Sequence, residues 1–369
     1  MPILWRYLLR NYFQVLFLCV LAFVSILLVS RSQDIARFAS SGAPIKSVLL
    51  FTFLQIPHIL PLAIPIACLI ATILLFQKLS HTHELTAMRA CGLGIKTIIS
   101  PLLLAGAVFS VINFSIISEL APQCRIITKK LTYEMTAVNP LFLFQKGTLV
   151  KIKDTFVDMK LLRMGKRAED VIFIINNKSH DRLNLVVAKE FSLDGDQLKG
   201  ENVALISFVD SKIEDGFDHL VIENQTTMST KASNLSQFIQ NTDWYSNYDF
   251  LPLRMVLVKN KDDKTRVRSR DHLSKNRGDL EICKRVSLGL AAFTFTLIGI
   301  GFGMDIGRNR SKKGIFWAIG LAAFFLICFV TAKSWRHTPY ICYLVYFLPH
   351  PIIIGLSWHA LKRVSKGVE

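Results

Sequence analysis

The sequence lacks the short motifs that mark common nucleotide-binding and hydrolytic enzymes. Its 369 residues contain no G-x-x-x-x-G-K-S/T, so we expect no ATP binding through a P-loop. There is no G-x-S-x-G, and Ala87 stands where H-E-x-x-H would need its second histidine after His83 and Glu84. His81 and His83 have no further ligand nearby, so no metal site is expected. We therefore predict that the chain is not an enzyme and carries no cofactor of its own.

Acidic residues are scarce over most of the chain. Of the 27 acidic residues, 21 lie between residues 125 and 280, together with 25 of the 44 basic residues. That block has a net charge of only +4, so the remaining 19 basic and 6 acidic residues supply +13 of the total +17. Such an excess usually indicates nucleic acid or anionic lipid as a partner.

Cysteines are also few, and they form no disulfide framework. The middle block holds only Cys124 of the seven, at its edge. Four others lie in apolar runs and are most simply small hydrophobic residues: Cys19, Cys68, Cys328 and Cys342. A bridge between Cys124 and Cys283, which flank the middle block, stays open as the less favoured alternative to free thiols.

Long uncharged apolar runs dominate both ends of the chain. A helix needs about 20 apolar residues to cross about 30 Å of hydrocarbon. Six runs suffice, in two groups of three: 11–30, 47–77, 97–118, 286–304, 314–332 and 341–358. The second run carries Pro57, Pro61 and Pro65 on one face. Because each proline removes a backbone donor, that face should meet protein or a cavity that satisfies the freed carbonyls.

Basic residues are unevenly divided between the two sides of these spans. The positive-inside rule predicts cytoplasmic N- and C-termini and puts the middle block outside the cytoplasm. In that orientation 12 of the 19 basic residues are cytoplasmic: Arg6, Arg10, Lys78, Arg89, Lys96, Arg308, Arg310, Lys312, Lys313, Lys362, Arg363 and Lys366. Because topology explains the positive charge, we reject nucleic acid as a partner.

Seven other basic residues would lie at the outer membrane boundary: Arg31, Arg37, Lys46, Lys284, Arg285, Lys333 and Arg336. In the simpler interpretation they extend to phospholipid headgroups, as long basic side chains do at span ends. In the alternative they form a ring that pairs with the phosphates of one lipid. Arg31 is the best single candidate for that role, because it ends a span with no acidic residue before Asp34.

The middle block, residues 121–280, has the pattern of β structure. Short runs rich in Val, Ile, Leu and Phe are separated by polar turns such as Asp194-Gly195-Asp196 and Asp215-Gly216. Their spacing predicts a sandwich or jelly roll, and the block is long enough to bury its own core. Residues 259–279 are rich in Lys, Arg and Asp and predict a mobile linker back to the membrane.

A short polar segment between the second and third runs reads HELTAMRACG (residues 83–92). Thr82 can cap a helix, Glu84 lies in its first turn and Gly92 suits its end. The pattern predicts an amphipathic helix of about two turns, too short to be stable alone. Two interpretations remain open: a coupling helix against which an ATPase subunit pushes, or an ordinary capped loop.

The layout resembles the LptF/LptG permeases of lipopolysaccharide export over nearly the whole chain. The resemblance is carried by RYLLRNY (6–12), by ELTAMRACG (84–92) and by DLEICKRVSLGLAAFTFTLIGIGFGM (279–304). Family members usually have a proline soon after the arginine that enters the fourth span, whereas this chain has Ser287-Leu288-Gly289. The β block shows no motif that matches residue by residue.

The resemblance implies that two such permeases pair over a cytoplasmic ATPase dimer, which holds ATP and magnesium. Glu84 and Arg89 would make polar contacts with the ATPase, Leu85 and Met88 would make apolar ones, and Gly92 would end the helix. Lipopolysaccharide would come in from the outer leaflet of the inner membrane, between the first span of one permease and the fifth of the other. Collapse of the cavity would expel it towards a periplasmic bridge of jelly rolls. Its phosphates would meet Arg31, Arg37, Lys46, Lys333 and Arg336.

We therefore predict a multi-pass permease of the bacterial inner membrane, α-helical with six transmembrane helices (3+3) and an inserted extracytoplasmic all-β, jelly-roll-like domain. The expected parts are residues 1–120 with the coupling helix at 82–92, residues 121–280, and residues 281–369. The nearest alternative is an ABC permease for another lipid. A sensor or scaffold is disfavoured because only 11 residues follow Trp358, and a lipid-modifying enzyme because only His58 and His350 fall inside the spans.

Overall fold

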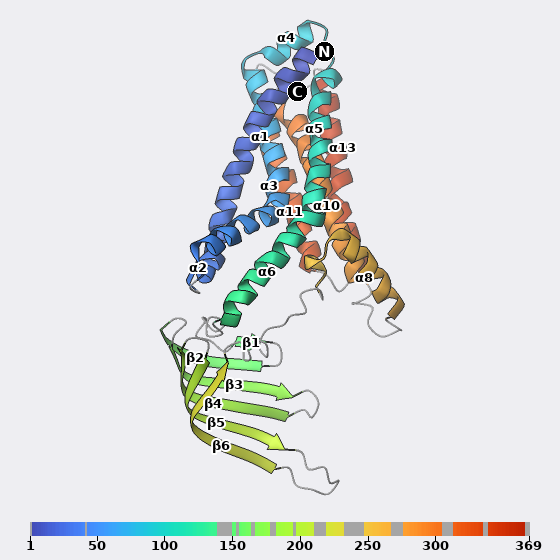
Figure 1. Cartoon of the computed structure of the whole chain (residues 1–369). Helices are drawn as coiled ribbons and strands as arrows, with labels where there is room; N and C mark the ends of the chain where they lie inside the picture. Colours follow the sequence, from blue (N-terminus) through green and yellow to red (C-terminus); the bar gives the residue numbers. More distant parts are fainter. Residues whose placement is uncertain are drawn as a thin grey trace. The chain divides into compact units, whose positions relative to one another are not determined.

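The computed structural model describes residues 2–40, 43–138, 150–152, 155–163, 167–177, 182–194, 197–209, 219–231, 247–266, 276–304, 313–334 and 339–365. The chain divides into two compact units. The helical unit comprises Met1–Arg31, Leu54–Ile126 and Tyr245–Glu369. The second unit comprises Ser32–Phe53 and Ile127–Trp244, and it contains the β strands (Figure 1).

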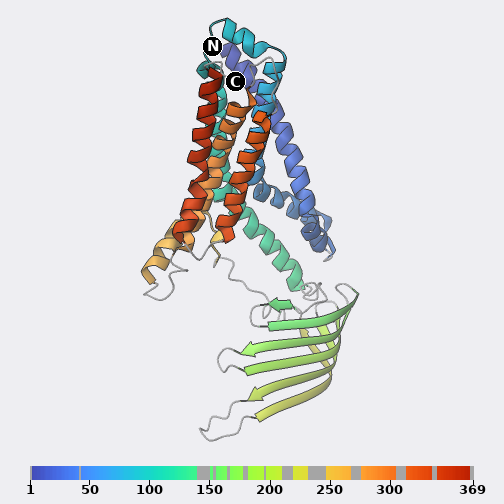
Figure 2. The same ribbon diagram turned by 180° about the vertical axis from the view of Figure 1, so that it is seen from behind.

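Six helical segments within these ranges are long and apolar enough to cross a membrane, which confirms the predicted spans: Ile3–Ser30, Ile45–His81, Ile95–Glu134, Arg277–Gly303, Lys313–Ser334 and Pro339–Val364. The corresponding elements are α1 (Pro2–Ser30), α3 (Ile45–His81), α5 (Ile95–Ser115) with its continuation, α10 (Arg277–Gly303), α11 (Lys313–Ser334), and the pair α12 (Pro339–Phe347) and α13 (Pro349–Ser365). The start of α1 and the end of α13 lie at the same end of the helical unit as the short helix α4 (Glu84–Ala90), as Figures 1 and 2 show.

The three prolines of the second run lie inside α3, as predicted. Pro65 has no N–H to donate to the carbonyl of Pro61, four residues earlier. The side-chain amide of Asn113, on α5, donates to that carbonyl at 3.2 Å and to the Leu288 carbonyl at 2.9 Å. Asn113 is fully buried, so a neighbouring helix supplies the partner that a proline inside a membrane span requires.

Helix α10 packs closely against other spans through its glycines. A Cβ at Gly299 would lie 2.7 Å from the Thr72 Cβ and 2.9 Å from the Leu69 carbonyl oxygen, both on α3. A Cβ at Gly301 would lie 3.0 Å from the Ser357 carbonyl oxygen on α13. Small residues allow membrane helices to approach in this way, and α10 is accordingly the most buried of the six spans.

The third span continues well beyond the predicted run. Helix α5 passes through a π-helical turn, η1 (Ile116–Leu120), into α6 (Ala121–Val138). The expectation that the β block begins at residue 121 is therefore wrong. This stretch contains no glycine. Its one proline, Pro122, has no N–H to donate to the Ser118 carbonyl, and Ser118 lies in the π-helical turn η1. An i,i+4 pair between Lys130 and Glu134, at 3.9 Å, adds local support on the exposed face.

The strands form one antiparallel sheet in sequence order: β1 (Val150–Ile152), β2 (Thr155–Arg163), β3 (Arg167–Asn177), β4 (Arg182–Asp194), β5 (Gln197–Val209) and β6 (His219–Lys231). Figure 2 shows this sheet as a single curved layer. An inserted all-β domain is thus confirmed, and β4 ends and β5 begins around the predicted turn at residues 194–196. The described strands make a meander, without the crossover connections of a jelly roll.

A small core of buried side chains lies on one face of the sheet. Val171, Phe173, Ala188, Phe191 and Val203 come from three adjacent strands and are all buried. The rings of Phe173 and Phe191 meet edge-on, with centroids 6.0 Å apart. A shared set of buried side chains of this kind is what an antiparallel sheet with one covered face produces.

The predicted linker at residues 259–279 is partly helical, contrary to expectation. Helix α8 (Leu253–Arg266) covers its first part and contains neither glycine nor proline. Val256 is fully buried, and the Asn260 amide donates to the Asp279 carboxylate of α10 at 2.7 Å. Residues 267–275, and the turn expected at Asp215-Gly216, lie outside the described residues.

Candidate functional site

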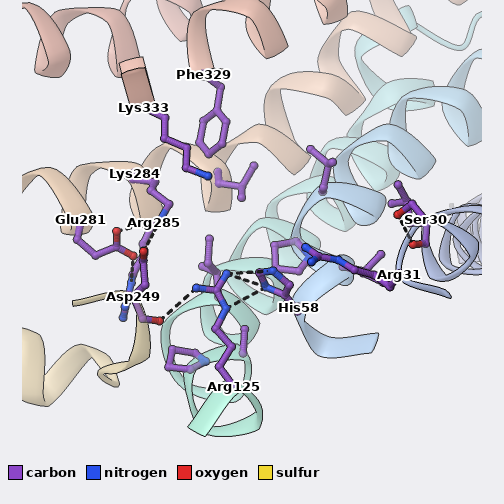
Figure 3. A pocket seen from close by; sticks show the side chains of 18 residues that line it. Ser30, Arg31, His58, Arg125, Asp249, Glu281, Lys284, Arg285, Phe329 and Lys333 are labelled. Carbon is purple, nitrogen blue, oxygen red and sulfur yellow. Dashed lines mark hydrogen bonds and ion pairs between the residues drawn. The ribbon is translucent and has the colours of Figure 1, made fainter. Parts of the chain in front are cut away.

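A cavity of about 350 Å³ lies in the helical unit at the end opposite α4. Its walls come from the ends of several spans and from a 3-10 turn, η4 (Tyr248–Phe250). Along α1, 23 residues separate Tyr7, which contacts α4, from Ser30, which lines the cavity, and this corresponds to about 35 Å of helix. Figure 3 shows the polar residues of the wall: Ser30, Arg31, His58, Arg125, Asp249, Glu281, Lys284, Arg285 and Lys333.

Arg125 and His58 form a pair between the third and second spans. The Nε and Nη2 atoms of Arg125 lie 3.1 and 2.7 Å from Nδ1 of His58, and Nη1 donates to the Asp249 backbone carbonyl at 3.4 Å. A guanidinium group can only donate, so Nδ1 of His58 accepts and carries no proton. The imidazole therefore fixes the guanidinium of Arg125 at the wall of the cavity.

Two carboxylates hold the basic residues at the start of α10. The Lys284 ammonium lies 2.8 Å from Asp249 Oδ1 and 2.9 Å from Glu281 Oε2, and Arg285 Nε lies 3.0 Å from Glu281 Oε1. Burial by itself would raise the pKa of the Asp249 carboxyl, but the neighbouring Lys284 ammonium outweighs burial and holds this pKa well below its usual range. Asp249 is therefore ionised at any physiological pH.

Arg285 has a structural position within this group. It is 1% exposed and, besides Glu281, donates to the backbone carbonyls of Ser118 at 3.3 Å, Tyr248 at 3.0 Å and Leu251 at 2.9 Å. These bonds use four of its five N–H groups. Arg285 thus ties the third span and the η4 turn to α10.

The cavity carries a positive charge. Five cations (Arg31, Arg125, Lys284, Arg285 and Lys333) face two carboxylates, which leaves a net charge of +3 with His58 neutral. Figure 3 shows the charged ends of Arg31, Arg125 and Lys333 pointing into the same space, from the turn after α1, from α6 and from α11. Guanidinium and ammonium groups in this arrangement suit an anion with several oxygen atoms, such as a phosphate.

The structure brings together part of the predicted ring of basic residues. Arg31 and Lys333 line the cavity, as do Lys284 and Arg285. Arg37, on α2 (Ser32–Ser40), and Lys46 belong to the second unit and are not among the described lining residues. Arg336 lies outside the described residues.

Arg125 and His58, which line the cavity, were not predicted from the sequence as site residues. Arg125 was assigned to the β block. Between residues 118 and 125 only Pro122 disfavours a helix, so the sequence would have allowed the third span to be extended to Arg125. His58 was visible as the one ionisable residue of the second run. Its role depends on Arg125, so the first omission caused the second.

Residues 84–90 of the HELTAMRACG segment form α4, but the predicted N-terminal cap by Thr82 is wrong. The Thr82 hydroxyl oxygen lies 3.0 Å from both the Lys78 carbonyl oxygen and Glu84 Oε1, so its one proton is shared between these acceptors and the side chain does not cap α4. His83 precedes the helix in the left-handed region, with φ of 58°, and makes no side-chain cap bond. Gly92 does end the helix: its φ is 82°, and its N–H bonds to the Arg89 carbonyl at 2.9 Å.

Burial on α4 separates an inner face from an outer one. Leu85 is 1% exposed within the core of the helical unit, and Met88 packs against the same core. Leu85 therefore faces the core of this chain, while Met88 is half-buried against it, and the contact of these residues with an ATPase stays a prediction. Arg89 is half-buried. Thr86, Ala87 and Ala90 of α4 are exposed, as are His83 before the helix and Cys91 and Gly92 after it.

Fold and site together define a multi-pass membrane permease: six spans, an inserted β domain, a positively charged cavity at one end of the spans and a short connecting helix at the other. The chain belongs to the LptF/LptG family, because the family model described as lipopolysaccharide export system permease LptF/LptG matches residues 6–363. Permeases of this family are transporter subunits rather than enzymes. No curated protein matches the chain in a sequence comparison.

Proposed function

We propose that this chain is one of two permease subunits of an ATP-driven exporter that extracts lipopolysaccharide from the bacterial inner membrane and passes it to a periplasmic bridge. The observation that carries the proposal is the cavity, where five cations outnumber two carboxylates at one end of the spans. The lipid anchor of lipopolysaccharide bears phosphates, which guanidinium and ammonium groups bind through charge-assisted hydrogen bonds. The family match favours this lipid over others.

The same proposal includes an orientation. The start of α1, the end of α13 and the whole of α4 share one end of the helical unit (Figure 1), and the positive-inside bias assigns that end to the cytoplasm. The cavity then opens at the periplasmic face, and the β domain lies in the periplasm. An exposed edge strand of its sheet can pair with a strand of a bridge protein.

The burial of the spans supports a pair of permeases. The most apolar windows of α1 and α11, the first and fifth spans, are only 6% and 22% buried within this chain, whereas that of α10 is 78% buried. These two spans have the most surface left for lipid or for another subunit. We place the path of the lipid between the first span of one permease and the fifth span of its partner.

A separate motor is required on energetic grounds. Removing a lipid from a bilayer costs about 0.8 kcal/mol for each exposed CH₂ group. A passive site cannot do this repeatedly, and we assign ATP and magnesium to a cytoplasmic ATPase dimer. The outer face of α4 (His83, Thr86, Ala87 and Ala90) would dock on one ATPase subunit, since its small side chains allow close approach.

The test is purification of the tagged chain in detergent, followed by mass spectrometry of its proteins and lipids. Wild type should recover a second six-span permease, an ATPase and lipopolysaccharide. Ala87→Arg, on the outer face of α4, should lose the ATPase, whereas Ala39→Arg, also on an exposed helical position, should keep it. Recovery of an ATPase with a different lipid would replace the lipopolysaccharide assignment by the alternative of a permease for another lipid.

A further inference from the structure

Two sequence motifs that lie 77 residues apart meet in one contact. The Tyr7 hydroxyl donates to Glu84 Oε2 at 2.9 Å, and the Thr82 hydroxyl donates to Oε1 of the same carboxylate at 3.0 Å. Tyr7 belongs to RYLLRNY at the start of the first span, and Glu84 is the first residue of α4. Both oxygen atoms of the carboxylate are thus engaged within the chain, one of them by α1.

A second contact lies one helical turn further along α1. The Lys78 ammonium donates to Asn11 Oδ1 at 3.3 Å, and the Asn11 amide donates to the Tyr7 backbone carbonyl at 3.1 Å. Between these polar residues, Leu8 and Tyr12 are fully buried in the core that also contains Leu85. One face of α1 is therefore fixed to the end of α3 and to the start of α4.

Helix α4 needs such support. It has seven residues, and its preceding residue, His83, makes no side-chain cap bond. A helix of this length is not stable alone in water. Leu85 holds it by burial, which restrains its depth in the core but is not directional. The Tyr7–Glu84 hydrogen bond is directional and joins α4 to one particular span.

We propose that Tyr7 is a positioning residue that joins α4 to the first span, so that a displacement of α4 by the ATPase moves α1. This rests on the proposed function, in which α4 receives the motion and α1 borders the path of the lipid. The contact needs one residue from each motif, Tyr7 from RYLLRNY and Glu84 from ELTAMRACG, so this role accounts for the presence of both motifs in one chain. The role of Tyr7 depends on its hydroxyl group, because the residue is 39% exposed and its ring fills no closed part of the core.

The test compares Tyr7→Phe with Tyr340→Phe, a matched control at a tyrosine that is 85% exposed at the start of α12. Both variants are studied in the purified complex with its ATPase. The first measurement is hydrogen–deuterium exchange over residues 84–92. Loss of one hydrogen bond to a charged group should speed exchange there by about tenfold in Tyr7→Phe and leave the control at the wild-type rate. Unchanged exchange in Tyr7→Phe would overturn the contact as a support of α4.

The second measurement is the amount of lipopolysaccharide released from proteoliposomes for each ATP hydrolysed. This ratio should fall by about threefold or more in Tyr7→Phe, and the double variant Tyr7→Phe/Glu84→Gln should be no worse than Glu84→Gln alone. Faster exchange with an unchanged ratio would overturn the transmission of motion through Tyr7. A wild-type complex that releases no lipopolysaccharide would instead refute the proposed function, and the exchange result would still decide the contact.

Discussion

The Arg285 guanidinium donates to the Ser118 carbonyl, to which Pro122 cannot donate because a proline has no N–H. The π-helical turn η1 lies at this point, as is common where a helix loses a regular bond. Ser287, two residues further along α10, donates its hydroxyl to the Tyr346 carbonyl at 2.9 Å, in the last turn of α12.

Replacing Arg285 by lysine should destabilise the protein by about 2–3 kcal/mol, because an ammonium cannot reach Ser118, Tyr248 and Leu251 together and leaves buried carbonyls unpaired. Thermal unfolding in detergent measures the change. Arg277→Lys, at an exposed position of the same helix, is the control and should unfold like wild type. Equal midpoints for both variants would show that the three carbonyl bonds contribute nothing.

Replacing Asn113 by leucine should also destabilise the protein, by about 1–3 kcal/mol, since the carbonyls of Pro61 and Leu288 lose their donor away from water. Ser115→Ala is the comparison, because the Ser115 hydroxyl bonds only to Val111 in its own helix. A stabilised Asn113→Leu variant would mean that the freed carbonyls find other partners.

Alanine at Gly299 should cost about 1–3 kcal/mol through overpacking against Thr72 and Leu69, despite the gain in helix propensity. Alanine at Gly320, on α11, meets nothing within 4 Å and should be neutral or slightly stabilising. The pair isolates the close approach of α10 and α3 from propensity, and urea or thermal unfolding of both variants reports it. The same loss in both would point to propensity or backbone effects.

The Asp249 carboxyl should give a stability difference with a defined pH dependence. Its pKa is lower in the folded protein than in the unfolded chain, where it is about 4, so its contribution is complete above that value and is lost as the pH falls below it. Asp249→Asn should therefore be less stable than wild type by a constant amount from pH 8 to pH 5. The difference should shrink by pH 3. A difference that changes between pH 8 and pH 5 would assign the titration to another group.

Neutralising a lysine inside the cavity should weaken lipid binding more than neutralising one outside it. Lys333→Gln removes a charge-assisted contact and should lower lipopolysaccharide affinity by about tenfold. Lys46→Gln, in the second unit, should change affinity by less than about twofold. Binding of fluorescent lipopolysaccharide to the detergent-solubilised complex measures both, and a larger loss for Lys46→Gln would restore the wider ring of basic residues.

The sequence by itself determined the parts of the fold that depend on local composition. A backbone inside a bilayer must satisfy its own hydrogen bonds, and a long uncharged run does so by forming a helix. All six spans could therefore be located from the sequence. Short runs rich in Val, Ile, Leu and Phe located β3, β4, β5 and β6, and Gly92 marked the end of α4 because a left-handed residue there favours glycine. The motifs shared with the LptF/LptG permeases, such as RYLLRNY and ELTAMRACG, extended the prediction from a fold to a class of protein.

Only the tertiary structure decided which of the basic residues belong together. Arg31 lies in the turn after α1, Arg125 on α6 and Lys333 on α11, and their convergence depends on how these elements end and pack. The continuation of the third span through η1, which carries Arg125 to the cavity, depends on partners such as Arg285 that are distant in sequence. The inward direction of Leu85 was likewise invisible locally, because an amphipathic helix of two turns shows an apolar face but not what covers it.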